Sequence, residues 1–67
     1  MYEGIVKWFN YQRGYGFIES TALDGDIFLH HTAFVHHDEY IHEGGTVLFE
    51  IAPGEKGVKA INVTLKE

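Results

Sequence analysis

The sequence predicts a small all-β protein, a single five-stranded antiparallel β-barrel formed by residues 1–67. Three observations support this. The chain has 67 residues, a length that suits one domain. Its apolar and aromatic residues fall into five short runs bounded by turn residues. No stretch has the periodicity of a long helix. Closing five strands into a barrel also removes the edge strands that would otherwise pair with other chains.

The five runs are rich in β-branched and aromatic residues, and they are separated by glycine, proline and polar turns. They cover residues 4–10, 14–20, 26–31, 46–52 and 58–64. The single proline, Pro53, lies between the last two runs, where its missing N–H breaks no ladder. Residues 32–34 are expected to form one helical turn, with Phe34 closing the barrel. The expected interior consists of Val6, Ile18, Ile27, Leu29, Val47 and Ile51.

Composition excludes several classes of function. The chain has no cysteine, and therefore no disulfide, no thiolate zinc site and no cysteine nucleophile. No apolar stretch approaches the length of a membrane span, so we expect a cytoplasmic protein without a membrane partner. The sequence shows none of three common signs of an active site: a phosphate-binding glycine loop, a suitable pair of carboxylates, or an activated hydroxyl. We therefore expect no enzyme activity, no catalytic residue and no cofactor.

The net charge of −5 is unevenly distributed along the chain. Residues 1–18 carry a balance of +1 and residues 56–67 a balance of +2, whereas residues 19–55 contain eight carboxylates and no lysine or arginine. If the two ends of the chain pair in the fold, they create a locally positive surface on an acidic body. Such a surface can hold a nucleic-acid strand although the whole protein is acidic.

Aromatic residues are concentrated near the start of the chain, where five of the ten residues 8–17 are aromatic. Strand alternation places Tyr15 and Phe17 on one face, and Phe28 and His30 on one face of the next strand. The aliphatic residues suffice for a small interior, so these rings are expected to face solvent. Glycines beside them, at positions 14 and 16, are expected to leave the rings open. A row of exposed rings stacks unpaired bases with little sequence preference.

Three segments together resemble the bacterial cold-shock protein family. They are Lys7-Trp8-Phe9-Asn10, Arg13-Gly14-Tyr15-Gly16-Phe17-Ile18 and Asp26-Ile27-Phe28-Leu29-His30. The second and third resemble the two ribonucleoprotein-type motifs of that family, and the resemblance extends over nearly the whole chain. It implies an OB-fold barrel that binds single-stranded RNA or DNA. It also implies an RNA chaperone that regulates transcription and translation.

The resemblance also implies which residues bind the strand. Stacking is expected from Trp8, Tyr15, Phe17, Phe28 and His30, with Phe9 as a further ring at the same surface. Basic positions beside the strand are Lys7, Arg13 and Lys56, and polar positions that can bond base edges are Asn10 and Asp26.

Two departures from the family pattern affect the outer binding positions. His31 stands where the family usually has a phenylalanine. The loop after Phe34 is one residue shorter and lacks the glycine-flanked phenylalanine, so that Tyr40 alone is left as a substitute.

Five histidines suggest an alternative, a histidine-rich protein-interaction or metal-binding barrel with weak or lost nucleic-acid binding. They lie within residues 30–42, and clustered histidines can bind zinc or copper. Adjacent strand residues point to opposite faces, however, so neither His30-His31 nor His36-His37 chelates as a pair. Charge tuning by pH and simple solvated histidines are the other interpretations. We expect no metal site and a monomeric protein.

Overall fold

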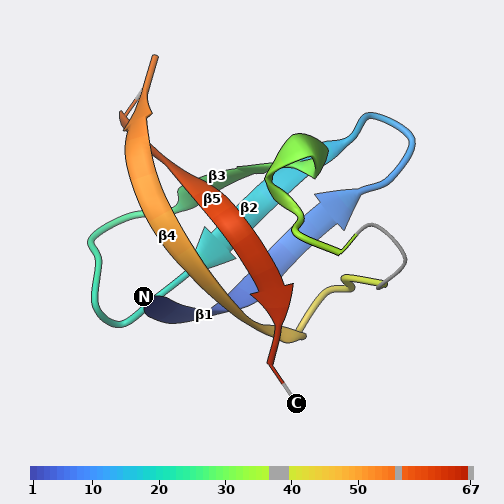
Figure 1. The fold of residues 1–67 in the computed structure, drawn as a ribbon, viewed down its shortest axis with the longest axis horizontal. Helices are drawn as coiled ribbons and strands as arrows, with labels where there is room; N and C mark the ends of the chain where they lie inside the picture. Colours follow the sequence, from blue (N-terminus) through green and yellow to red (C-terminus); the bar gives the residue numbers. More distant parts are fainter. Residues whose placement is uncertain (37–39, 56, 67) are drawn as a thin grey trace.

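The computed structural model describes residues 1–36, 40–55 and 57–66. Its elements are five strands, labelled in Figure 1, and one short 3₁₀ helix, drawn there as an unlabelled green coil. In chain order they are β1 (Tyr2–Asn10), β2 (Tyr15–Glu19), β3 (Ile27–His30), η1 (His31–Ala33), β4 (Thr46–Gly54) and β5 (Gly57–Leu65). The five expected strands are therefore all present, with ends that differ by a few residues. Within this described part of the chain, no helix has the length and apolar character needed to cross a membrane.

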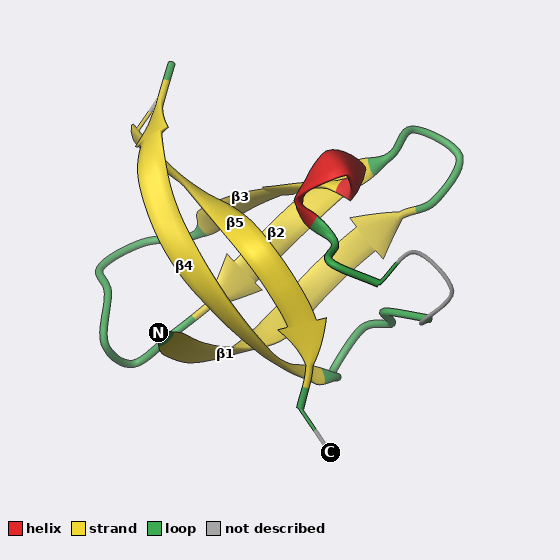
Figure 2. Ribbon diagram, viewed as in Figure 1, coloured by secondary structure: helices red, strands yellow, loops and turns green. Residues whose placement is uncertain are grey.

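The strands close into a barrel in the order β1-β2-β3-β5-β4 (Figure 2). β1 pairs through its first half with β4 and through its second half with β2, so it serves both sides of the barrel. The β1–β2, β1–β4, β2–β3 and β4–β5 pairings are antiparallel, as expected. β3 and β5, however, run parallel and share the single register pair Phe28–Lys59. The five-stranded all-β barrel is confirmed, and the exception to its antiparallel pairing is the seam between β3 and β5.

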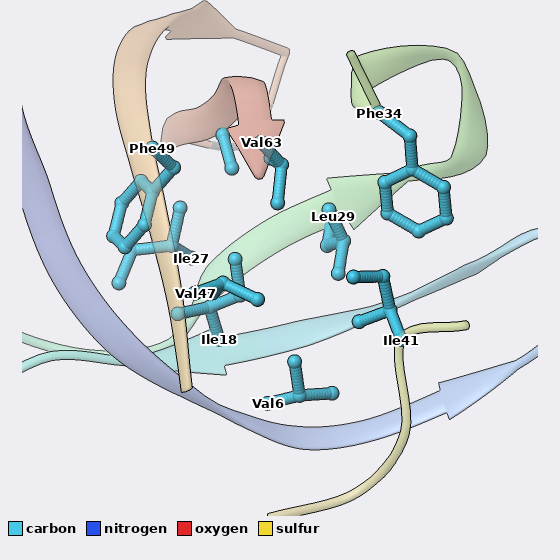
Figure 3. Packing of buried hydrophobic residues seen from close by; sticks show 10 residues of the cluster. Val6, Ile18, Ile27, Leu29, Phe34, Ile41, Val47, Phe49 and Val63 are labelled. Carbon is cyan, nitrogen blue, oxygen red and sulfur yellow. The ribbon is translucent and has the colours of Figure 1, made fainter. Parts of the chain in front are cut away.

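The barrel interior is filled by one apolar cluster, shown in Figure 3. Five of the six expected core residues are almost fully buried: Val6, Ile18, Ile27, Leu29 and Val47. The sixth, Ile51, is only half-buried and packs at the edge of the cluster. Phe49 is fully buried and was not expected in the core, while Ile41, Ala60 and Val63 complete the interior. Each fully buried aliphatic or aromatic side chain of this kind contributes about 1.5–3 kcal/mol.

One end of the barrel is closed by Phe34, which directly follows η1. The helical turn covers His31–Ala33, one residue earlier than expected. Phe34 follows it directly, is 7% exposed and points toward Leu29 and Ile41 (Figure 3). The expected role of Phe34 as a plug is confirmed.

Candidate nucleic-acid interface

Five rings from three neighbouring strands meet on the outer face of the barrel. Strand register places Trp8 opposite Phe17, Phe17 opposite Phe28, and Tyr15 opposite His30. Directly opposite residues project from the same face of a sheet. We call this group the ring platform; it consists of Trp8, Tyr15, Phe17, Phe28 and His30. These five residues were expected at one surface, and the structure brings them together there.

The platform rings contact one another in several geometries: Tyr15 and Phe28 are stacked, and the other pairs meet edge-on or tilted. The centroid of Trp8 lies 5.5 Å from those of Tyr15 and Phe17. Phe28 lies 5.9 Å from Tyr15, 5.8 Å from Phe17 and 6.3 Å from His30. Phe28 is 36% exposed and the other four are half-buried. An exposed apolar surface of this kind on a small protein is typical of a binding site.

Gly16 has a different role from the one expected. It lies in β2 between two platform residues, but it is buried and faces the other side of the strand. A Cβ at this position would collide with the carbonyl oxygen of Trp8 and lie 2.7 Å from the Cα of Phe9. The missing side chain therefore lets β1 and β2 approach closely. It does not serve to open the rings.

Phe9 is not part of the platform, contrary to expectation. A register irregularity between Val6 and Trp8 marks a β-bulge at Lys7. A bulge adds one residue to a strand, so that the residues after it change faces. Trp8 consequently points outward, and Phe9 points back toward the core, where its ring lies 5.3 Å from that of Phe34.

Three of the five polar and charged residues expected beside the platform are engaged within the protein: Lys7, Asn10 and Asp26. Lys7 Nζ lies 3.2 Å from Asp26 Oδ2, an ion pair between half-exposed side chains. Asn10 Oδ1 accepts a hydrogen bond of 2.9 Å from the backbone N–H of Arg13, so its amide carbonyl stabilises the β1–β2 turn. The Arg13 side chain is exposed and forms no ion pair among the described residues. Lys56 lies outside the described residues.

The two histidines at the junction of β3 and η1, His30 and His31, extend the platform. Their ring centroids are 4.5 Å apart, and His31 is exposed. The His31 ring covers Gly14, whose φ of +78° favours glycine and where a Cβ would lie 2.7 Å from His31 Cδ2. His30 is held by Thr32, whose backbone N–H lies 3.3 Å from His30 Nδ1. The imidazoles are thus fixed by the start of η1 and by the β1–β2 turn.

A hollow of about 810 Å³ lies between the platform and the β4–β5 hairpin. Tyr15, Phe17 and Phe28 line one side, and Pro53, Val58 and Lys59 line the other. Lys59 was not expected at the site. Its proximity to Phe28 results from the parallel β3–β5 pairing, for which the sequence carries no local signal. Lys59 is exposed and forms no ion pair with the described residues, which distinguishes it from Lys7.

A second aromatic group lies at the β1–β2 turn, outside the platform. Tyr11 and Tyr40 are stacked, with centroids 5.1 Å apart and an interplanar angle of 12°. Tyr11 Oη also accepts a hydrogen bond of 2.6 Å from the backbone N–H of Ile41. Tyr40, the expected substitute for the loop phenylalanine, is thus packed on Tyr11 and remains 67% exposed.

The histidines and carboxylates form no cluster suited to a metal ion among the described residues. His37, Asp38 and Glu39 lie outside these residues. The His42 ring stacks on Tyr40, with ring centroids 5.9 Å apart. Among the described rings, His42 forms no contact with His30 or His31, which contact each other. The arrangement that the site offers is therefore a flat apolar surface with cations at its border.

Comparisons with known proteins agree with this geometry. A family model for the 'Cold-shock' DNA-binding domain matches residues 2–66. The chain is 42% identical over 66 residues to a cold shock protein of Arthrobacter globiformis, covering 97% of this chain and 98% of that protein. It is 45% identical over 64 residues to cold shock protein CspB of Bacillus caldolyticus, covering 94% and 96%.

Longer proteins also contain a similar segment. Y-box-binding protein 1 of Xenopus laevis is 44% identical over 66 residues, covering 91% of this chain, which spans 22% of that protein's length. The chain spans 18% of human Y-box-binding protein 3, at the same identity. A solved structure of Drosophila Unr, described as CSD456, has the same fold, with a TM-score of 0.84. The match covers 98% of this chain and 26% of that one, at 20% sequence identity. The fold, the platform and these matches together show that the chain belongs to the cold-shock family of nucleic-acid-binding domains.

Proposed function

We propose that this protein binds single-stranded RNA or DNA by stacking unpaired bases on the ring platform. The observation that carries the proposal is the exposure of the five platform rings on one face, above strands whose opposite face is the core. Every base has a π-face, and a stacked base contributes about 1–3 kcal/mol. A duplex hides those faces, so the platform favours unpaired strands.

The electrostatics of the site suit moderate rather than tight binding. The protein carries a net charge of −5, and Lys7 is already paired with Asp26. Two exposed cations form no ion pair with described residues: Lys59, which lies beside Phe28, and Arg13 in the β1–β2 turn. Stacking therefore provides most of the affinity, and phosphate contacts provide a smaller part that depends on salt.

Binding of this kind fits an RNA chaperone that acts on transcription and translation. A platform that reads π-faces accepts many sequences and stabilises RNA in its unpaired form, without chemistry on the strand. The closed barrel also leaves few unpaired strand edges for contact with another copy, so we propose a monomer.

Tryptophan fluorescence tests the proposal, because Trp8 is the single tryptophan and belongs to the platform. Oligo-thymidine and oligo-uridine should quench it, while a duplex oligonucleotide of equal length, the control, should have a much smaller effect. No change at saturating single strand would contradict the proposal. If zinc then altered the signal instead, the histidine-rich alternative would gain support.

A further inference from the structure

The barrel has a recess where β3 and β5 separate. These parallel strands share the register pair Phe28–Lys59, and the next β-bridge along this seam joins Phe34 to Val63. Between these two contacts lies a hollow of about 480 Å³. We call it the β5 recess. One wall comes from His30 and η1, and the other comes from β5 at Lys59, Ile61 and Asn62.

The β5 recess continues the platform rather than standing apart from it. Phe28 and His30 belong to the platform and also line the recess. Phe28 and Lys59 line both the recess and the larger hollow beside the platform, so this pair forms a ridge between them. A strand that stacks on Phe28 therefore has the larger hollow on one side of the ridge and the recess on the other.

The chemistry of the recess suits a nucleotide. Its volume lies in the range of about 300–1,000 Å³ usual for small-molecule sites. Its lining combines apolar surface from Phe34 and Ile61 with polar side chains from Thr32 and Asn62. The Asn62 amide nitrogen donates a hydrogen bond of 3.1 Å to Glu50, while no described partner binds its Oδ1. This acceptor remains for a base or sugar donor.

Lys59 provides charge at the ridge. Among the ion pairs of the described residues, Lys7 is held by Asp26 and Lys66 by Glu3, but Lys59 has no carboxylate partner. An ammonium group without a partner, next to a stacking ring, is placed to neutralise a phosphate that links a base on Phe28 to the next nucleotide.

From this placement we propose that the β5 recess receives one nucleotide of the bound strand as it leaves the platform past Phe28. The Lys59 ammonium contacts the phosphate that crosses the ridge. This inference rests on the proposed single-strand binding and adds to it a specific exit path. The occupant is a nucleotide of the strand itself, not a free mononucleotide.

Amide chemical shifts measured during titration with oligo-thymidine of increasing length locate the strand directly. We expect a trimer to shift mainly the amides of β2 and β3, and an octamer to shift those of Thr32, Ile61 and Asn62 as well. Thymidine monophosphate is the control ligand. If the octamer quenches Trp8 but leaves the recess amides unshifted, the exit path is wrong. The same holds if the monophosphate alone shifts them as strongly as the octamer.

The variant Lys59→Gln tests the phosphate contact, with Lys66→Gln as its matched control. Both lysines are exposed, but Lys66 pairs with Glu3 and lines neither hollow. Lys59→Gln should weaken octamer binding several-fold and lower the salt slope by about 0.7, whereas Lys66→Gln should change neither. Equal slopes for the two variants would overturn the role of Lys59. If the octamer does not quench Trp8 fluorescence in the wild-type protein, single-strand binding itself is contradicted.

Discussion

The ammonium group of Lys7 lies 3.2 Å from Oδ2 of Asp26, and Asp26 also lines the hollow beside the ring platform. The pair connects β1 to the turn before β3 and leaves half of each side chain exposed. An exposed pair of this kind stabilises a fold by about 0–1 kcal/mol. Its greater effect is on binding, because a phosphate must compete with Asp26 for the cation and is repelled by the carboxylate.

Asp26→Asn should therefore strengthen binding of oligo-thymidine several-fold at low salt. The substitution frees Lys7 to neutralise a phosphate, so the slope of log K against log salt should steepen by up to about 0.7. Glu3→Gln is the matched control, since Glu3 pairs with Lys66 and lines neither hollow. Fluorescence titrations at several salt concentrations measure both slopes. Weaker binding of Asp26→Asn would mean that Asp26 itself contacts a base.

Phe17→Ala and Phe28→Ala should each weaken oligonucleotide binding by about 1–3 kcal/mol, the contribution of one stacked base. Because these rings lie outside the core, each should cost less stability than the 3–5 kcal/mol typical of a buried phenylalanine. Phe49→Ala is the contrast, since Phe49 is fully buried and should show that larger loss. Urea unfolding and fluorescence titration of the same samples separate the two effects. A folded Phe17→Ala protein with normal affinity would place the strand elsewhere.

How much the sequence could predict is clearest in β2 and β3. Both strands are regular, so simple alternation correctly separated Tyr15 and Phe17 from buried Ile18, and Phe28 from buried Leu29. A period of two is reliable wherever one face of a strand is buried and its register is unbroken.

Irregular pairing explains the features that the sequence did not predict. The bulge at Lys7 turns Phe9 inward, and bulges have no strong signature in a single sequence. In β4 the register shifts again between Leu48 and Glu50, and Phe49 is buried more deeply than Ile51. Lys59 reaches the platform through a contact between strands that are distant in the chain. Tertiary pairing, rather than local pattern, determines all three positions.

Phe9→Ala should behave as a core truncation rather than as a loss of a stacking ring. Phe9 packs against Phe34, which closes the barrel, and against Tyr11 at 4.8 Å. We expect it to destabilise the fold more than Phe28→Ala does, by about 2–4 kcal/mol for a half-buried phenylalanine. The protein that remains folded should bind oligo-thymidine within a few-fold of the wild type. A large loss of affinity without a loss of stability would show that Phe9 contacts the bound strand.

Tyr11→Phe should loosen the segment around Ile41 without disturbing the platform. The variant keeps the ring that stacks on Tyr40 but removes the oxygen that accepts the Ile41 N–H at 2.6 Å. Loss of one such bond should cost about 0.5–1.5 kcal/mol and should speed hydrogen exchange at the Ile41 amide. Tyr40→Phe is the control, because no described residue bonds the Tyr40 hydroxyl. Equal exchange rates in the two variants would show that stacking, not the hydrogen bond, holds this segment.

His31→Phe should extend the platform by one ring. The His31 ring is exposed, lies 4.5 Å from His30 and rests against Gly14, so a phenyl ring can occupy the same place without meeting a Cβ. A larger apolar ring at this position offers a better stacking surface, and we expect binding of a long oligo-thymidine to strengthen by about 1 kcal/mol, the low end of one stacked base. Thr21→Phe, at an exposed position that lines neither hollow, is the control for a general gain in hydrophobicity and should leave the affinity unchanged. The gain should vanish for oligonucleotides too short to reach His31 from Trp8. If His31→Phe binds more weakly than the wild type at every length, then the imidazole itself, through its polar nitrogens, provides the contact at this end of the platform.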